Sequence, residues 1–160
     1  MVERSALIAT AVEARAYYEG KLAGAHHVHC HGHEVTVVFQ RGATHLYSKE
    51  GDVAGIAPEL VVRRDIARGR TEERVFSLER AQLMDEVLRA ISGYTVSIPG
   101  KGRDPTRNRQ LFGPRLASGF YLCVVLDRGP GTAWTCLTAY PADVGKWRSA
   151  CSAKRAKFPP

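Results

Sequence analysis

An isolated histidine, a group of loop cations and a pair of strand hydroxyls are the residues of this chain whose types suit phosphate chemistry. Cleaving RNA without a metal needs a base for the 2′-hydroxyl, an acid for the leaving 5′-oxygen, and cations or hydrogen-bond donors for the charge that develops on the phosphate. His45 stands alone just past the Arg41-Gly42 turn, and a histidine side chain suits proton transfer near neutral pH. We expect His45 to be the acid or base, with a purely structural histidine as the alternative.

The other groups for such a site lie in the C-terminal half. Thr138 and Tyr140 are two residues apart, so they share one face of a strand and can donate hydroxyl hydrogen bonds, although both residue types are common in strands. The segment from Pro99 to Pro114 is predicted to be a binding loop. Arg109 is our candidate for the catalytic cation, although any arginine of the loop could fill that role. The expected phosphate contacts of this loop also include Lys101, Arg103 and Arg107.

A histidine-rich segment offers a different chemistry. Five of the six histidines lie between His26 and His33, and at two-residue spacing four of them would form a row on one strand face with Cys30 nearby. Residues two apart on a strand are separated by about 6.6 Å, so only two neighbouring histidines can share a tetrahedral zinc ion. No HExxH or CxxC motif supplies a third ligand. We therefore expect no metal or other cofactor and interpret the row as a polar strand edge.

The positive charge is concentrated in one part of the chain. Residues 1–97 hold 12 Lys and Arg against 13 Asp and Glu, whereas residues 98–160 hold 11 against 3, giving net charges of −1 and +8. A field of one sign concentrates anions, and nucleic acid is the commonest large anion in a cell. We expect RNA or DNA to be the partner, with a solvated basic surface as the alternative.

Length and composition predict one domain over residues 1–160. One core serves roughly 100 to 200 residues, and 44% hydrophobic residues is ordinary for a globular protein. The longest apolar runs are far below the ~20 residues of a membrane span, and no Sec signal precedes the first helix. We expect no membrane contact and a cytoplasmic site of action.

The cysteines lack CxxC spacing, so reduced thiols are expected at Cys30, Cys123, Cys136 and Cys151.

The predicted elements follow an α+β order. An amphipathic helix is expected over residues 4–22, followed by two or three short antiparallel strands over residues 27–47. Residues 59–74 fit either a short helix or a mobile connection. Ser77 caps a second helix that ends at Gly93, and residues 94–98 form a strand. The simplest arrangement is helices packed against one antiparallel β-sheet, with a basic tail over about residues 145–160.

A hairpin is predicted near the C-terminus, with strands over residues 119–127 and 132–140. Pairing Asp127 with Thr132 would place Cys123 opposite Cys136 and Tyr121 opposite Thr138. A disulfide between those cysteines is the alternative to free thiols. The two-residue period would also put Trp134, Cys136, Thr138 and Tyr140 on one face.

These segments resemble a known group of small nuclease domains. The strand Tyr121–Leu126, a turn, and Leu137-Thr-Ala-Tyr-Pro141 followed by basic residues are similar to the ending of the barnase/EndoU/colicin/RelE-like (BECR) domains of bacterial toxins and phages. Bacterial ribonuclease-A-like toxins have a similar ending. The segments Tyr17–Leu22, Val35–Phe39 and Thr44-His-Leu46 also resemble the phage branch, and the likeness covers about half of the chain.

The resemblance implies a BECR-like α+β fold and metal-independent cleavage of structured RNA such as tRNA. It also implies a toxin or phage-derived nuclease, with an immunity protein or antitoxin as a further partner. Carried over by position, it points to His45 as acid or base, and to Thr138 and Tyr140 as contacts to phosphate or base. Tyr121 is expected beside the substrate. The toxin branches place a histidine near the N-terminal helix, which here has none, so the catalytic histidine could instead lie in residues 26–33.

Two other functions compete with a ribonuclease. A noncatalytic RNA- or DNA-binding module would use the same basic C-terminal half without turnover. A metal-binding protein would use the histidine row.

Overall fold

The computed structural model describes residues 7–101, 104, 106–129 and 131–160. The chain divides into two compact units, which sequence length alone does not predict. Unit 1 consists of Met1–Ala23 and Arg41–Asp85, and unit 2 consists of Gly24–Gln40 and Glu86–Pro160. No helix in the described part of the chain is long and apolar enough to cross a membrane.

Unit 1 combines a short helical segment with a small sheet. The first helix starts where the Thr10 side chain accepts the N–H of Glu13 at 3.1 Å, and its buried side presents Ala14, Tyr18 and Leu22 at helical spacing. The predicted helix is therefore confirmed over residues 11–22, and residues 4–6 lie outside the described residues. The elements of unit 1 are α1 (Ala11–Tyr17), the π-helical turn η2 (Tyr18–Leu22), β3 (Ser48–Lys49), the 3₁₀ turn η3 (Pro58–Leu60), β4 (Val61–Ile66), β5 (Arg70–Phe76) and α2 (Leu78–Ala81).

Of the two or three antiparallel strands expected over residues 27–47, the structure has two, Gly24–Cys30 and His33–Phe39, and residues 44–47 lie in a turn. The prediction for residues 59–74 is wrong. Residues 59–74 are neither a helix nor a mobile connection, because β4 and β5 pair as an antiparallel hairpin, with Val61 opposite Val75 and Ile66 opposite Arg70. With β3 they form a three-stranded sheet in the order β3-β5-β4.

The helix predicted from Ser77 to Gly93 is confirmed in its limits but is not continuous. Ser77 Oγ accepts the N–H of Arg80 at 3.3 Å, and Gly93 follows the last helical residue. Between these ends the segment consists of α2, the 3₁₀ turn η4 (Met84–Glu86) and α3 (Val87–Ser92).

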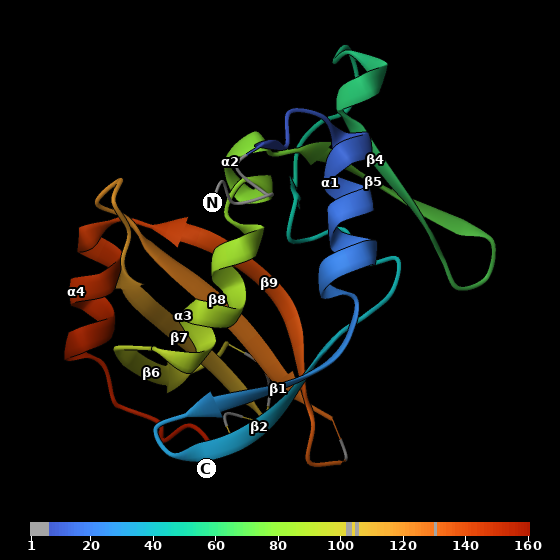
Figure 1. Cartoon of the computed structure of the whole chain (residues 1–160). Coiled ribbons are helices and arrows are strands. Elements are labelled where there is room, and N and C mark those ends of the chain that lie inside the picture. Colours follow the sequence, from blue (N-terminus) through green and yellow to red (C-terminus); the bar gives the residue numbers. More distant parts are fainter. Residues whose placement is uncertain (1–6, 102–103, 105, 130) are drawn as a thin grey trace. The chain divides into compact units, whose positions relative to one another are not determined.

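Unit 2 is a six-stranded sheet in the order β1-β2-β9-β8-β7-β6, which curls in Figure 1. Its strands and helix are β1 (Gly24–Cys30), β2 (His33–Phe39), β6 (Val96–Pro99), β7 (Asn108–Arg115), β8 (Tyr121–Arg128), β9 (Trp134–Ala142) and α4 (Val144–Ser152). All neighbouring pairs are antiparallel except β2 and β9, which pair in parallel. The protein is thus mixed α+β, as predicted, but the prediction of one purely antiparallel sheet is wrong.

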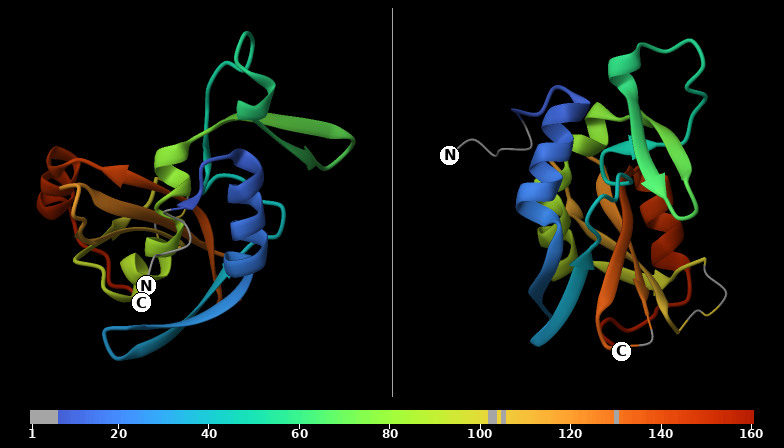
Figure 2. Two further views of the ribbon diagram at one scale, coloured as in Figure 1. Left: turned by 45° about the horizontal axis from the view of Figure 1, so that its top comes forward. Right: turned by 90° about the vertical axis from the view of Figure 1, so that its right-hand side faces the viewer.

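Helices lie on both faces of the unit 2 sheet. On one face α3 approaches β7 so closely that a Cβ at Gly113 would lie 2.7 Å from Ala90 Cβ, so only glycine fits there. On the other face α4 covers a cluster around Phe112, Tyr121 and Ala150. The two views of Figure 2 show the sheet of this unit from further directions.

The C-terminal segment is not simply a basic tail. Asp143 caps α4 by accepting the N–H of Lys146 at 2.8 Å, and the helix then runs to Ser152. The expected loop over residues 99–114 is also shorter than predicted, because β7 begins at Asn108.

The hairpin of β8 and β9 is confirmed, but its predicted register is wrong. Val125 lies opposite Thr138, and Leu126 lies opposite Cys136, so a β-bulge at Leu137 interrupts the pairing. Asp127 pairs with Thr135 instead of the predicted Thr132, and the bulge shifts the register by one further residue. Cys123 therefore faces Tyr140 instead of Cys136, and Tyr121 faces Ala142 instead of Thr138. All four cysteines are free, in line with the expected reduced thiols.

Candidate active site

His45 lies in a turn of unit 1 beside the sheet of β3, β4 and β5. The exposed fraction of its side chain is 32%, so the imidazole is accessible to solvent but partly enclosed. Its Nε2 lies 3.8 Å from Oε1 of Glu72, a residue of β5. The imidazole of His45 therefore faces the carboxylate of Glu72.

Two arginines of the hairpin surround the same carboxylate. Arg64 on β4 lies directly opposite Glu72, and its Nη2 is 3.2 Å from Glu72 Oε2. Arg74 is two residues beyond Glu72 on the same strand, so both side chains point to one face, and Arg74 Nη1 is 3.7 Å from Glu72 Oε1. Glu72 therefore sits among three basic side chains.

A third arginine reaches the site from α2 and meets Arg74 at Ser48 on β3. Arg80 donates from Nη1 to the Ser48 carbonyl at 2.9 Å, and Arg74 donates from Nε to Ser48 Oγ at 2.8 Å. The Ser48 hydroxyl in turn donates to the carbonyl of Thr44 at 2.7 Å, which anchors the turn that holds His45. Because Arg74 and Ser48 are almost wholly buried, this scaffold is fixed in place.

We call His45, Arg64, Glu72, Arg74 and Arg80 the His45 cluster. Its three guanidiniums and one carboxylate leave an excess of two positive charges around a neutral imidazole. Burial lowers the pKa of His45, Arg74 lowers it further, Glu72 raises it, and Arg64 and Arg80 lower it again. The imidazole is therefore unprotonated near neutral pH and can accept a proton.

One buried hydrogen-bond donor in the cluster, Nε of Arg64, has no acceptor among the described residues. A buried donor without an acceptor is costly, and an anionic oxygen would satisfy it. The cluster therefore suits an oxyanion such as a phosphate better than it suits a cation.

The paired hydroxyls predicted on β9 belong to unit 2. Thr138 and Tyr140 face Val125 and Cys123, which are two residues apart on β8, so the prediction that the two hydroxyls share a face fits the observed register. The bulge turns Trp134 and Cys136 to the opposite face, so the four-residue row predicted for this strand is wrong.

Two of the residues predicted for the active site, Arg109 and Tyr121, are buried in unit 2. Arg109 is 6% exposed on β7, and its guanidinium donates to the carbonyls of Asn108 at 2.9 Å and Lys157 at 3.2 Å. Burial lowers the pKa of Arg109, and Arg128 lowers it further. Tyr121 is also buried and stacks on Trp147. These contacts favour structural roles for both residues.

The remaining loop residues are closer to solvent. Arg107 donates from Nε to the carbonyl of Arg128 at 2.9 Å, whereas Lys101 is exposed. Arg103 lies outside the described residues. The structure thus groups His45 with residues of unit 1, whereas Arg109, Thr138, Tyr140 and the other predicted contacts belong to unit 2.

The histidine row does not form. His31 lies in the tight turn with Gly32, both with positive φ, and His33 begins β2 opposite Cys30. His27 lies on the exposed side of the hairpin and pairs with Thr36 and Glu34. Among the residues that the structure describes, no group of three or more His, Cys, Asp or Glu could hold a metal ion.

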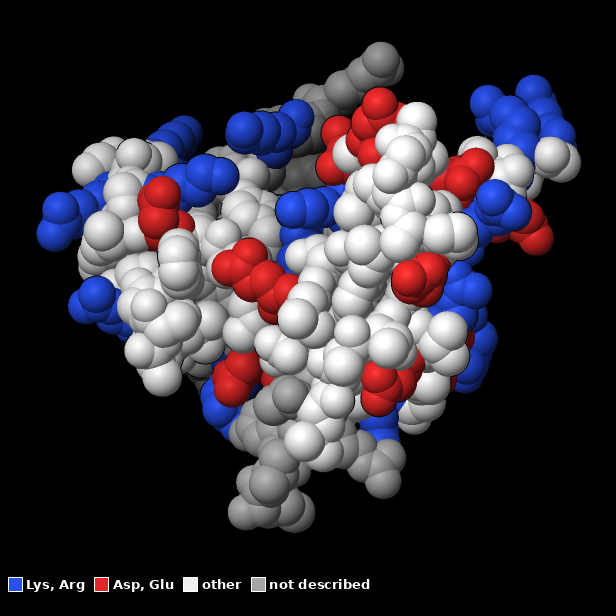
Figure 3. Space-filling view, turned by 90° about the horizontal axis from the view of Figure 1, so that it is seen from above, with Lys and Arg blue, Asp and Glu red and all other residues white. Residues whose placement is uncertain are grey.

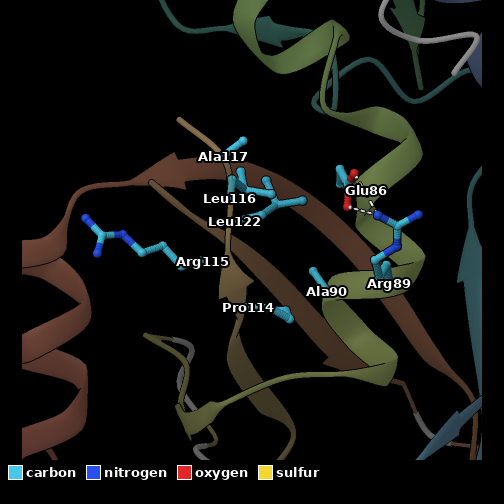
Figure 4. Close-up of a pocket in the computed structure, with 8 residues that line it drawn as sticks. All are labelled: Glu86, Arg89, Ala90, Pro114, Arg115, Leu116, Ala117 and Leu122. Carbon is cyan, nitrogen blue, oxygen red and sulfur yellow. Dashed lines mark hydrogen bonds and ion pairs between the residues drawn. The ribbon is translucent and has the colours of Figure 1, made fainter. Parts of the chain in front are cut away.

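A cavity of about 320 Å³ in unit 2 provides a different environment (Figure 4). It lies between α3 and the turn that joins β7 to β8, and Ala90, Leu116 and Leu122 form part of its wall. Glu86 and Arg89 pair with each other at 3.0 Å at its edge. The third charged residue of the lining, Arg115, directs its side chain away from the other lining residues (Figure 4). The cavity therefore gathers less charge than the His45 cluster.

Surface charge by itself does not single out a site. On the face shown in Figure 3, Lys and Arg side chains are interspersed with Asp and Glu. On this face no single basic patch marks a site, so the candidate sites are located from specific side-chain clusters.

Comparison of the sequence with protein-family models found no match, and comparisons with curated proteins and with solved structures found none either. The geometry of the described residues is therefore the basis for the functional argument. Sequence reasoning found His45 but missed its partners Arg64, Glu72, Arg74 and Arg80. The turn signal Arg68-Gly69 between two strand-length segments could have revealed the hairpin that holds most of them.

Proposed function

We propose that this chain is a metal-independent endoribonuclease whose active site is the His45 cluster. The observation that supports it most strongly is the placement of the His45 imidazole beside one carboxylate and three arginines within a single compact unit. These are the groups that proton transfer and phosphate stabilisation require. Structured RNA such as tRNA is the proposed substrate.

In the proposed reaction, His45 is the general base. Its imidazole takes the proton from a ribose 2′-hydroxyl, and the 2′-oxygen forms a bond to the adjacent phosphorus. The bond between phosphorus and the 5′-oxygen then breaks, and the leaving oxygen takes a proton from solvent. The products are one RNA end with a 2′,3′-cyclic phosphate and one with a 5′-hydroxyl. Positioned acid–base groups contribute about 10²- to 10⁴-fold to such rates.

The arginines supply the electrostatic part of the mechanism. Negative charge grows on the phosphate oxygens as the 2′-oxygen attacks, and preorganised donors in a partly enclosed site stabilise it. Arg64 has a buried N–H without an acceptor among the described residues, and Arg74 is held rigidly by Ser48. Glu72 orients these guanidiniums and faces His45.

The donor set of the cluster also supports independence from metal. A divalent cation would have to approach the single carboxylate of Glu72 through the field of three guanidiniums. Such surroundings disfavour the cation and favour an anionic substrate. The proposed reaction accordingly needs no cofactor.

The BECR resemblance is part of the same proposal. The mixed α+β fold and the C-terminal hairpin that ends in Thr138, Tyr140 and Pro141 are compatible with it. A toxin or phage-derived nuclease of this kind would require an immunity protein or antitoxin as its protein partner and would act on RNA in the cytoplasm.

A noncatalytic RNA- or DNA-binding module is the second candidate, and the charge of unit 2 favours it. Residues 24–40 and 86–160 hold 12 Lys and Arg against 5 Asp and Glu, so this unit accounts for the whole net charge of +7. Binding through counterion release needs no catalytic group.

One experiment separates the two functions. The purified protein is incubated with total RNA and with tRNA in excess EDTA, and the new RNA ends are analysed. The ribonuclease proposal predicts fragments with 2′,3′-cyclic phosphate and 5′-hydroxyl ends. Binding of RNA without any fragments would instead support the noncatalytic module.

A further inference from the structure

Unit 2 contains a second cavity, of about 470 Å³, between α4 and the sheet. This volume lies within the range of about 300–1,000 Å³ that is typical of small-ligand sites. On the helix side the cavity is lined by small residues, with Gly145 and Ser149 four residues apart on one side of α4 and Ala153 directly after its last residue. The helix therefore leaves space above the sheet where larger side chains would have closed it.

The sheet side of this cavity is apolar except for the side-chain amide of Gln110. Ile98, Phe112 and Tyr140 contribute the apolar surface, and Gln110 lies between them on the same sheet face, opposite Ile98. No hydrogen bond joins the Gln110 side-chain amide to another described residue. An amide carries both donors and an acceptor, which can read the edge of a nucleobase.

Two exposed lysines, Lys101 and Lys146, line this cavity. The Lys146 ammonium lies 5.2 Å from the centre of the Tyr140 ring. α4 itself contains no Asp or Glu, and the carboxylate of Asp143, which precedes it, accepts the backbone N–H of Lys146 as the helix cap. The lysines therefore present positive charge to an incoming anion, in the unit that holds all of the net charge of the chain.

We propose that this cavity binds one nucleotide unit, with the base over the apolar floor and the phosphate at Lys101 and Lys146. Aromatic surface, a hydrogen-bonding edge and nearby cations together match a base joined to a phosphate better than they match either part alone. The site goes beyond the proposed cleavage at His45 and does not depend on it. A free nucleotide and a nucleotide of single-stranded RNA share this chemistry, and we assign the cavity to single-stranded RNA because unit 2 is strongly basic.

The test measures binding, so it is independent of cleavage. AMP, UMP, a five-nucleotide single-stranded RNA with 2′-O-methyl groups, and inorganic phosphate are titrated into the full chain by calorimetry. The 2′-O-methyl groups prevent cleavage through the 2′-oxygen. We expect the oligonucleotide to bind more tightly than the mononucleotides, and both to bind more tightly than phosphate. Phosphate binding as tightly as AMP and UMP would overturn the assignment of a base site, and mononucleotides binding as tightly as the oligonucleotide would overturn the assignment to RNA.

Matched variants on α4 and in the tail locate the site. Ser149→Phe fills the cavity, whereas Ser152→Phe adds the same side chain on an exposed residue of α4 outside the cavity lining. Lys146→Gln removes a cavity charge, and Lys154→Gln removes an exposed charge outside the lining. We expect Ser149→Phe to abolish oligonucleotide binding and Lys146→Gln to weaken it about tenfold, as for the loss of one charge-assisted hydrogen bond. Equal effects within each matched pair would overturn the proposal.

Discussion

His45 Nε2 lies 3.8 Å from Glu72 Oε1, although the two residues are far apart in the sequence. Their proximity depends on the β4–β5 hairpin, which brings Glu72 opposite Arg64, and on Ser48, which links Arg74 to the turn that holds His45. The proposed chemistry therefore depends on tertiary structure in unit 1.

The pH dependence of cleavage should follow the pKa of His45. A general base must be unprotonated, so the rate falls as pH falls through that pKa. Burial lowers the pKa of His45 from its ordinary value of 6.5, so we predict an acid limb in kcat/KM with a midpoint below 6.5. The measurement is kcat/KM against pH, with the histidine titration followed by NMR.

Two neighbouring variants should move this midpoint in opposite directions. Arg64 lowers the pKa of His45 and Glu72 raises it, so Arg64→Gln should raise the midpoint and Glu72→Gln should lower it. Shifts in the same direction, or no shift of the NMR titration in either variant, would contradict the arrangement of the cluster.

Arg109 should matter for stability. Its guanidinium is buried, bonds two main-chain carbonyls and lies 5.7 Å from the centre of the Trp134 ring. We predict that Arg109→Met lowers the free energy of unfolding by about 1–3 kcal/mol, because it removes charge-assisted hydrogen bonds from a buried guanidinium to two main-chain carbonyls. Urea denaturation measures this, with the exposed Arg148→Met as the control. Equal stability of the two variants would show that the contacts of Arg109 contribute little.

The register of β8 and β9 can be tested by disulfide formation. Tyr140 faces Cys123, and directly opposed residues are close enough for a disulfide. We predict that Tyr140→Cys forms a disulfide to Cys123 under mild oxidation, detected by mass spectrometry of unreduced peptides. The parent protein should form none between Cys123 and Cys136. A disulfide joining those two native cysteines would support the register predicted from the sequence instead.

Gly113 should tolerate no side chain. A Cβ at this position would lie 2.7 Å from Ala90 Cβ, and moving α3 away from β7 would disturb a packed core. We predict that Gly113→Ala lowers the free energy of unfolding by about 1–3 kcal/mol. Gly129→Ala is the control, since a Cβ there meets nothing within 4 Å. A fully stable Gly113→Ala protein would mean that α3 does not pack on β7 this closely.

Local signals in the sequence predicted several elements correctly. Ser77 and Gly93 mark the limits of a helical segment because capping chemistry acts over a few residues. The strands on either side of the turn at Arg128 were also predictable, since both are apolar and bounded by glycine and proline. Their register was not, because Asp127 pairs with Thr135 and not with Thr132, as a four-residue turn would require. The bulge at Leu137 then adds one further residue that no local pattern marks.

The sequence predicts only part of the candidate site, because the strands that hold most of it lack a clear alternation of apolar and polar residues. The β4–β5 hairpin has charged side chains on both faces, because one face is exposed and the other holds Arg64, Glu72 and Arg74. The alternation that identifies a strand is therefore missing. Only His45 could be singled out from its residue type.

The most direct test of the proposed function compares two histidine variants in single-turnover cleavage of tRNA in excess EDTA. His45→Gln removes the proposed base, whereas His27→Gln changes an exposed histidine of unit 2. With both variants folded by circular dichroism, we predict that His45→Gln lowers the rate about 10²- to 10⁴-fold and loses the acid limb, while tRNA affinity changes little. The rate of His27→Gln should equal that of the parent protein. A folded His45→Gln protein that cleaves tRNA at the parental rate with the same pH profile would contradict the proposed active site.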